Sequence, residues 1–266
     1  MGKKEKTMGT INNKIFILHG WTYSTEKWNP LIDLIKKNGF EVEMLNVPGL
    51  TEKIDKPWNI NDYVEWLKQK IDNQKVNNLT TSNVADAIKQ FNNKVILIGH
   101  SNGGRIALNF AIKHPEKLEK LILIDSAGIY RNNLVIRFKR MLFKSISKVG
   151  KKFSSSQKLK NILYKIVGES DYKNANPIMK QTMLNLINSD KSLSLNKVTV
   201  PTLIIWGEND QTTPLSDGKL MNKLIKNSKL NIVDNAKHSP MFTHTSDVAE
   251  IIIKNLNIEN SMKIGN

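Results

Sequence analysis

Short runs of apolar residues alternate with stretches of helical periodicity along almost the whole chain, and this alternation restricts the possible fold more than any other feature. The runs at residues 95–98 and 121–124 are apolar throughout, as parallel strands must be when helices cover both faces of a sheet. Amphipathic helical patterns lie between the runs. The predicted strands are residues 14–18, 40–46, 95–98, 121–124, 202–206 and 230–233. The pattern predicts βαβ units wound into one mostly parallel sheet of an α/β fold.

Composition excludes several classes of protein. The 266 residues include no cysteine, so thiol catalysis, Cys-ligated zinc and disulfide bonds are ruled out. No apolar run approaches the roughly 20 residues of a membrane-spanning helix, and the first residues lack the apolar stretch of a signal peptide. The five histidines show no metal-ligand spacing, and no phosphate-binding or dinucleotide-binding glycine motif occurs. We therefore expect a soluble cytoplasmic protein with no metal and no cofactor.

One long segment, residues 129–197, lacks any strand pattern. It holds 12 Lys and 3 Arg against 3 acidic residues, and so contributes +12 of the net charge of +16. Its apolar residues recur at helical spacing with basic residues between them. We expect a helical, basic insertion at 129–197 that divides a single core into residues 1–128 and 198–266. A shorter irregular segment, residues 73–93, is expected to hold one helix beginning near Ser82.

The basic insertion leaves three interpretations open. In the first, its charged face is merely solvated in a chain that is rich in lysine throughout. In the second, the insertion contacts an anionic membrane or an anionic substrate, since each Lys or Arg near an anionic leaflet contributes about 1 kcal/mol to the free energy of binding. Nucleic acid is disfavoured as a partner, because no recognised reading motif accompanies the charge and aromatic residues are sparse there.

A candidate nucleophile lies directly after the predicted strand 95–98. The sequence Gly99-His-Ser-Asn-Gly103 fits the pattern G-x-S-x-G and precedes a predicted helix. A nucleophile in this strained turn needs small neighbours, and the turn places its hydroxyl by the positive end of the following helix. Ser101 is therefore the predicted nucleophile.

Partners for a nucleophilic serine follow other predicted strands. Asp210 comes after strand 202–206 and His238 after the last strand, at the edge where parallel sheets build their sites. An imidazole activates a serine hydroxyl by taking its proton, and a buried carboxylate fixes the tautomer of that imidazole. Asp125 also ends a strand and competes with Asp210 for the acidic position; its alternative role is to hydrogen-bond loop backbone.

With Ser101, Asp210 and His238 in this order, the sequence resembles the α/β-hydrolase superfamily, in the branch that carries a helical lid. The resemblance covers about residues 15–256 and implies that Ser101 is the nucleophile, His238 the base and Asp210 the group that orients His238. The insertion would be the lid. Only 13 residues precede the first predicted strand, which leaves little room for the antiparallel hairpin of many members, so we expect about six strands.

The resemblance also implies an oxyanion hole. Its donors would be the backbone N–H groups of Trp21, in the sequence His19-Gly-Trp21, and of Asn102. The residues expected to support the nucleophile turn and the oxyanion loop are Gly99, His100, Gly103, Gly104, His19 and Gly20.

The expected function is hydrolysis of a carboxylic ester with a small or lipid-like apolar acyl group, by way of an acyl-enzyme. Apolar lid residues would line the acyl pocket: Phe138, Leu142, Phe143, Ile162 and Leu163. The same triad would also serve a C–C bond hydrolase, a thioesterase or a lactonase, or a slow-turnover sensor of small molecules, because this scaffold hosts many chemistries. The sequence sets neither the acyl chain length nor the oligomeric state.

Overall fold

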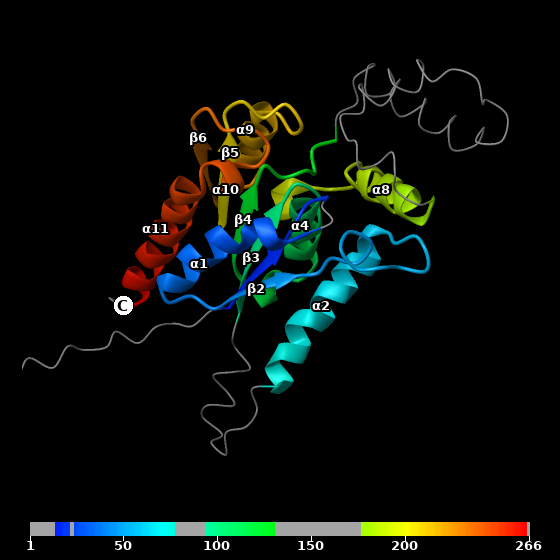
Figure 1. Cartoon of the computed structure of the whole chain (residues 1–266), viewed down its shortest axis with the longest axis horizontal. Coiled ribbons are helices and arrows are strands. Elements are labelled where there is room, and N and C mark those ends of the chain that lie inside the picture. Colours follow the sequence, from blue (N-terminus) through cyan, green and yellow to red (C-terminus); the bar gives the residue numbers. More distant parts are fainter. Residues whose placement is uncertain (1–13, 22–23, 78–93, 131–176, 265–266) are drawn as a thin grey trace, which may run out of the picture.

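The computed structural model describes residues 14–21, 24–77, 94–130 and 177–264. At its centre is a six-stranded sheet with the order β2-β1-β3-β4-β5-β6, in which every neighbouring pair is parallel (Figure 1). The strands are β1 (Ile15–Leu18), β2 (Val42–Leu45), β3 (Val95–His100), β4 (Leu118–Ile124), β5 (Thr202–Gly207) and β6 (Ser228–Val233). The predicted α/β fold and its six strands are confirmed.

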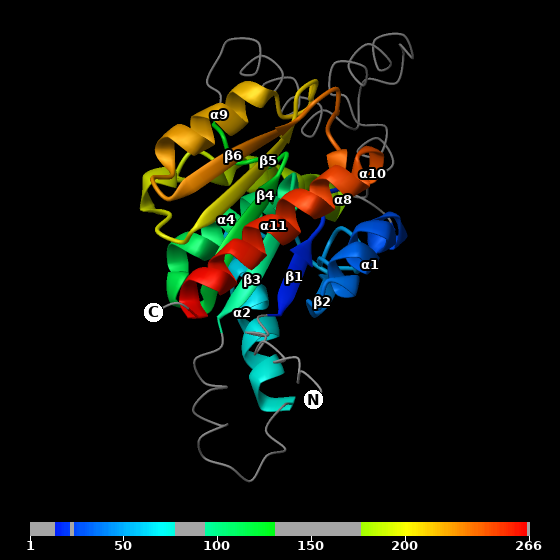
Figure 2. The same ribbon diagram turned by 90° about the vertical axis from the view of Figure 1, so that its left-hand side faces the viewer.

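Helices cover both faces of this sheet (Figure 2). One face packs against α1 (Asn29–Lys37) and α11 (Thr245–Ile264), and the other against α2 (Ile60–Asn77), α4 (Asn102–Lys113) and α9 (Leu215–Leu224). The remaining helices in the described part of the chain are α8 (Pro177–Ser189), α10 (Pro240–Thr243) and three 3-10 turns at 26–28, 115–117 and 195–197. Within the described ranges no helix is apolar over a length that would span a membrane.

The unbroken apolar runs have a direct structural cause. In β1, Ile15 and Ile17 belong to the core beneath α1 and α11, whereas Phe16 and Leu18 belong to the core beneath α2, α4 and α9. All four side chains are fully buried. Because side chains alternate between the faces of a strand, a sheet covered on both sides requires an apolar residue at every position.

Part of the predicted lid lies in the described residues. The structure shows α8 and the 3-10 turn at 195–197 there, and no strand among the described residues of 129–197. Residues 131–176 lie outside the described ranges, as does the helix predicted near Ser82. The boundaries of the lid therefore stay a prediction.

Candidate active site

The nucleophile turn connects β3 to α4 with Ser101 at its apex, where φ is 52° and ψ is −118°. A residue with a side chain adopts positive φ only where neighbouring contacts hold it there. Here the Ser101 N–H donates to the carbonyl of Ile124 (3.2 Å), and the Ser101 carbonyl accepts from the N–H of Ala127 (3.0 Å). These bonds fix the serine above the carboxyl edge of the sheet.

Small residues let the neighbouring segments approach this turn. A Cβ atom on Gly103 would lie 2.1 Å from the carbonyl oxygen of Leu18, at the end of β1. One on Gly20 would lie 2.9 Å from the Cβ of Ser101, so the loop after β1 rests directly on the nucleophile. Side chains would also collide with their surroundings at two other predicted positions, Gly99 and Gly104.

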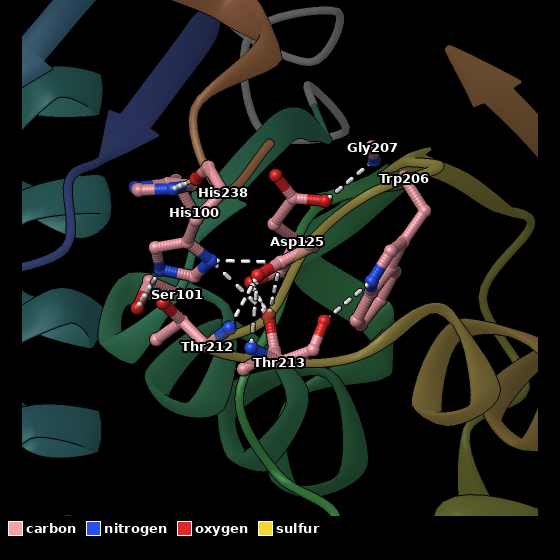
Figure 3. Close-up of polar contacts among 9 residues, drawn as sticks. His100, Ser101, Asp125, Trp206, Gly207, Thr212, Thr213 and His238 are labelled. Atoms are coloured by element: carbon pink, nitrogen blue, oxygen red, sulfur yellow. Dashed lines mark hydrogen bonds and ion pairs between the residues drawn. The ribbon is translucent and has the colours of Figure 1, made fainter. Parts of the chain in front are cut away.

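The structure brings Ser101, His238 and Asp210 into one hydrogen-bonded chain (Figure 3). His238 Nε2 lies 3.1 Å from Ser101 Oγ, and His238 Nδ1 lies 2.8 Å from Asp210 Oδ2. A carboxylate can only accept, so Nδ1 carries the proton and the Nε2 lone pair faces the serine hydroxyl. This is the tautomer that general-base catalysis requires.

Asp210 receives several donors besides the imidazole. The N–H groups of Thr212 and Thr213 donate to its Oδ1 at 2.7 and 3.1 Å, and the Thr213 hydroxyl lies 2.8 Å from its Oδ2. Burial alone would raise the pKa of Asp210, but the His238 ring and these donors together hold that pKa below its usual value. Asp210 is therefore ionised at neutral pH.

Asp125, the competing carboxylate, is held differently. Its backbone has φ 42°, and its Oδ1 accepts the N–H of Gly207 at 2.8 Å. Its Oδ2 is buried and has no hydrogen-bond partner among the described residues. Burial, assisted by the negative charge of Asp210, raises the pKa of Asp125 to about 8. The carboxylate that hydrogen-bonds His238 is that of Asp210.

Two further histidines support the site. His100 Nε2 donates to the carbonyl of His238 at 2.9 Å, and its ring packs edge-on against Trp28. Burial, together with the nearby His238 ring, lowers the pKa of His100 to about 3, so His100 stays neutral. His19 is buried, with Nδ1 donating to the Gly20 carbonyl (2.7 Å) and Nε2 accepting the N–H of Val47 (3.3 Å). Burial also lowers the pKa of His19.

The two residues predicted to supply the oxyanion donors are neighbours of the nucleophile turn, and the direction of their N–H groups stays a prediction. Asn102 is the first residue of α4, where a backbone N–H has no partner within the helix. Trp21 follows Gly20, and Gly20 lies against Ser101. The Trp21 side chain packs against the core beneath α2, α4 and α9. The predicted acyl-pocket residues all lie outside the described ranges: Phe138, Leu142, Phe143, Ile162 and Leu163.

One group of side chains has the composition of a metal site. Ligand-type atoms of His100, Asp125 and His238 lie within 4.8 Å of one another. Both ring nitrogens of His238 already face Ser101 and Asp210, and His100 Nε2 is bonded to a carbonyl. Because the His238 ring and His100 Nε2 already make these hydrogen bonds, we assign the group to the triad and its surroundings.

Sequence reasoning missed Thr213. Its hydroxyl lies within hydrogen-bond distance of the Asp210 carboxylate and of the Asp125 carbonyl (3.0 Å). The sequence did contain a signal. An aspartate side chain often accepts hydrogen bonds from the backbone N–H groups two and three residues later, which forms a tight turn, and threonines occupy both of those positions after Asp210.

Comparisons with known proteins agree with this geometry. A family model described as serine aminopeptidase, S33, matches residues 9–244. A pimeloyl-[acyl-carrier protein] methyl ester esterase of Legionella pneumophila is 25% identical, over 87% of this chain and 90% of that protein. Human monoacylglycerol lipase ABHD6 is 24% identical, over 94% and 78%.

Solved structures show the same fold. A putative lipase from Acinetobacter baumannii superposes with a TM-score of 0.68 at 20% identity, covering 96% of this chain and 86% of that one. An α/β-hydrolase from a lagoon-sediment metagenome gives 0.65 at 20% identity, covering 94% and 92%. The chain therefore belongs to the serine aminopeptidase S33 family of α/β-hydrolases.

Proposed function

We propose that this protein is a serine hydrolase that cleaves carboxylic esters through an acyl-enzyme. The observation that carries the proposal is the hydrogen-bonded chain Ser101–His238–Asp210, with its atoms 3.1 and 2.8 Å apart. Both relatives reported above are named for ester cleavage, which supports esters over the other bonds that this triad can break.

The geometry accounts for both half-reactions. Ser101 Oγ attacks the ester carbonyl while its proton passes to His238 Nε2, and Asp210 stabilises the imidazolium that forms. The carbonyl oxygen becomes an oxyanion, which the N–H groups of Trp21 and Asn102 would stabilise. His238 then gives the proton to the departing alcohol. Water, deprotonated by His238, attacks the acyl-enzyme and releases the acid and the free serine.

For the substrate, we propose an ester with a small or lipid-like apolar acyl group. The names of the relatives support this class, since one relative is named for cleaving a methyl ester of a carrier-bound acyl chain and the other for cleaving a monoacylglycerol. Contact of the basic segment with an anionic membrane rests on its charge alone and stays a prediction.

A p-nitrophenyl ester series from acetate to dodecanoate tests the proposal, with wild type, Ser101→Ala and the surface control Ser192→Ala. Ser192 is exposed, and among the described residues its hydroxyl bonds only the Ser189 carbonyl. We expect Ser101→Ala to lose at least about 10³-fold in kcat, because the nucleophile is gone, and Ser192→Ala to match wild type. The preferred acyl chain length would indicate the length of the acyl pocket. Comparing the rates of hydrolysis of methyl pimelate and of a monoacylglycerol would show which of the two relatives' substrates this protein resembles in its preference.

A fluorophosphonate probe decides what an inactive result means. If the probe labels wild type but not Ser101→Ala, and no ester is turned over, Ser101 is a reactive nucleophile but the protein is not an ester hydrolase. The function would then be C–C, thioester or lactone cleavage, or ligand sensing. Full ester turnover by Ser101→Ala would overturn the assignment of the nucleophile.

A further inference from the structure

A buried ion pair involves a residue one helical turn from Ser101 and takes no part in the reaction described above. Arg105 is one helical turn beyond Ser101, on α4, and Asp190 directly follows α8. Arg105 Nε bonds Asp190 Oδ1 at 2.7 Å and Arg105 Nη2 bonds Asp190 Oδ2 at 2.9 Å. The two side chains are only 7% and 5% exposed, so this is a two-pronged pair almost fully removed from water.

The same guanidinium also reaches the residue after the nucleophile. Arg105 Nη1 donates to Asn102 Oδ1, and Asn102 Nδ2 donates to the sulfur of Met183, on α8, at 3.6 Å. The Asn102 side chain is thus held from two sides, by α4 itself and by α8. Its backbone N–H is one of the two donors proposed for the oxyanion.

α8 is in turn fixed to the loop that precedes α2 (Figure 1). The N–H of Trp58 donates to the Thr182 hydroxyl at 3.1 Å, and the Asn185 side chain donates to the Trp58 carbonyl at 3.0 Å. Both backbone groups of one residue are therefore bonded to α8. This arrangement gives α8 a defined position from which it can orient Asn102.

We propose that Arg105 and Asp190 are positioning residues, which couple α8 to Asn102 and so align the Asn102 N–H with the developing oxyanion. This inference rests on the proposed function. It explains why an arginine lies here, since two donors of its planar fork bond Asp190 while a third bonds Asn102. If only adhesion between α4 and α8 were needed, an apolar pair would serve equally well, because burying charges is costly.

The decisive variant is Arg105→Met/Asp190→Leu, which replaces the ion pair by apolar side chains. Arg105→Met alone leaves the Asp190 charge buried without its partner and is expected to unfold easily, whereas the double variant removes both charges and restores stability. We expect its kcat per titrated active site to stay about tenfold below wild type, with KM changed less than twofold. Complete loss of an oxyanion donor costs more, about 10²–10³-fold, because here the donor is only misaligned.

Matched variants separate positioning from packing. Lys120, buried on β4 and bonded to the Asn255 side chain at 2.8 Å, offers Lys120→Met as a control that loses stability but keeps wild-type kcat. Asn102→Ala should lower kcat by a similar factor, and adding it to the apolar pair should cost little more, because both changes release the same donor. Wild-type kcat in the stable apolar pair, or multiplicative losses on adding Asn102→Ala, would overturn the proposal.

Amide hydrogen exchange supplies a readout that needs no turnover. The Arg105 N–H donates to the Ser101 carbonyl at 3.2 Å, in the first turn of α4. In the apolar-pair variant we expect this turn and α8 to exchange faster, and α9 and α11 to exchange as in wild type. Unchanged exchange in the first turn of α4 would overturn the coupling. Absence of ester turnover in wild type would refute only the proposed function, since the exchange result still decides the coupling.

Discussion

The neighbouring strands β4 and β5 both lead to an aspartate beside His238, and the two carboxylates differ in almost every respect. Asp210, after β5, receives the His238 ring, one hydroxyl and two backbone N–H groups. Asp125, after β4, receives the single N–H of Gly207 and has an unpartnered Oδ2 within the described structure. Accordingly the pKa of Asp210 is lowered and that of Asp125 is raised to about 8. The supply of donors, more than the position at a strand end, decides which carboxylate is charged.

The two strand ends consequently do different work. The turn after β5 folds back on itself, so its N–H groups point at Asp210. The chain after β4 instead joins its neighbours: the Asp125 N–H bonds the Ile205 carbonyl (3.0 Å), its Oδ1 bonds Gly207, and the Ala127 N–H bonds the Ser101 carbonyl (3.0 Å). The end of β4 holds the nucleophile turn in place, whereas the end of β5 supplies the negative charge of Asp210 beside the His238 ring.

The sharpest way to break this comparison is to neutralise each carboxylate in turn. Asp210→Asn should lower kcat on the order of 10⁴-fold, because the amide favours the wrong His238 tautomer and cannot stabilise the imidazolium. Asp125→Asn should stay within about threefold of wild type, since its Oδ1 can still accept the Gly207 N–H. Steady-state kinetics on the best p-nitrophenyl ester measures both. The opposite ranking would make Asp125 the catalytic acid.

A second effect, on stability, follows from the raised pKa of Asp125. The folded protein keeps the Asp125 proton up to about pH 8, whereas the unfolded chain loses it near 3.8. Between these values the unfolded state binds fewer protons, so rising pH favours unfolding, by up to ~1.4 kcal/mol per pH unit, and above pH 8 the contribution is constant.

Asp125→Asn removes this titration and is the direct comparison. Its free energy of unfolding relative to wild type should rise steadily from pH 5 to pH 8 and then level off, in urea titrations at each pH. A difference that does not depend on pH would mean that Asp125 is already ionised in the folded protein.

The contrast between the two aspartates also marks how far the sequence could be interpreted. Both were predicted at strand ends because the apolar runs and their order determine the sheet. The preference for Asp210 rests on the resemblance, because the local signal for its donors, Thr212 and Thr213, was not used. Asp190, 85 residues from Arg105, was likewise beyond sequence reasoning, because neither local spacing nor periodicity indicates which charges meet after folding. The contacts of Ser101, His238 and Asp210 could be predicted because motifs at successive strand ends mark these residues, whereas no motif marks the pair formed by Arg105 and Asp190.

The smallest predicted effect concerns Thr213, whose hydroxyl lies between the two strand ends, 2.8 Å from Asp210 Oδ2 and 3.0 Å from the Asp125 carbonyl. Thr213→Val keeps the shape of the side chain but removes its hydroxyl. Asp210 then keeps three donors, the His238 ring and two backbone N–H groups. We expect kcat to fall about three- to tenfold, with the acidic limb of the pH–rate profile moved, because the Asp210 carboxylate becomes less stabilised. Thr213→Ser keeps the hydroxyl and should match wild type, so equal losses in both variants would attribute the effect to packing. If the Val variant keeps full activity, the remaining donors to Asp210 suffice, and the single Thr213 hydroxyl proton goes to the Asp125 carbonyl, where it joins the ends of the two strands.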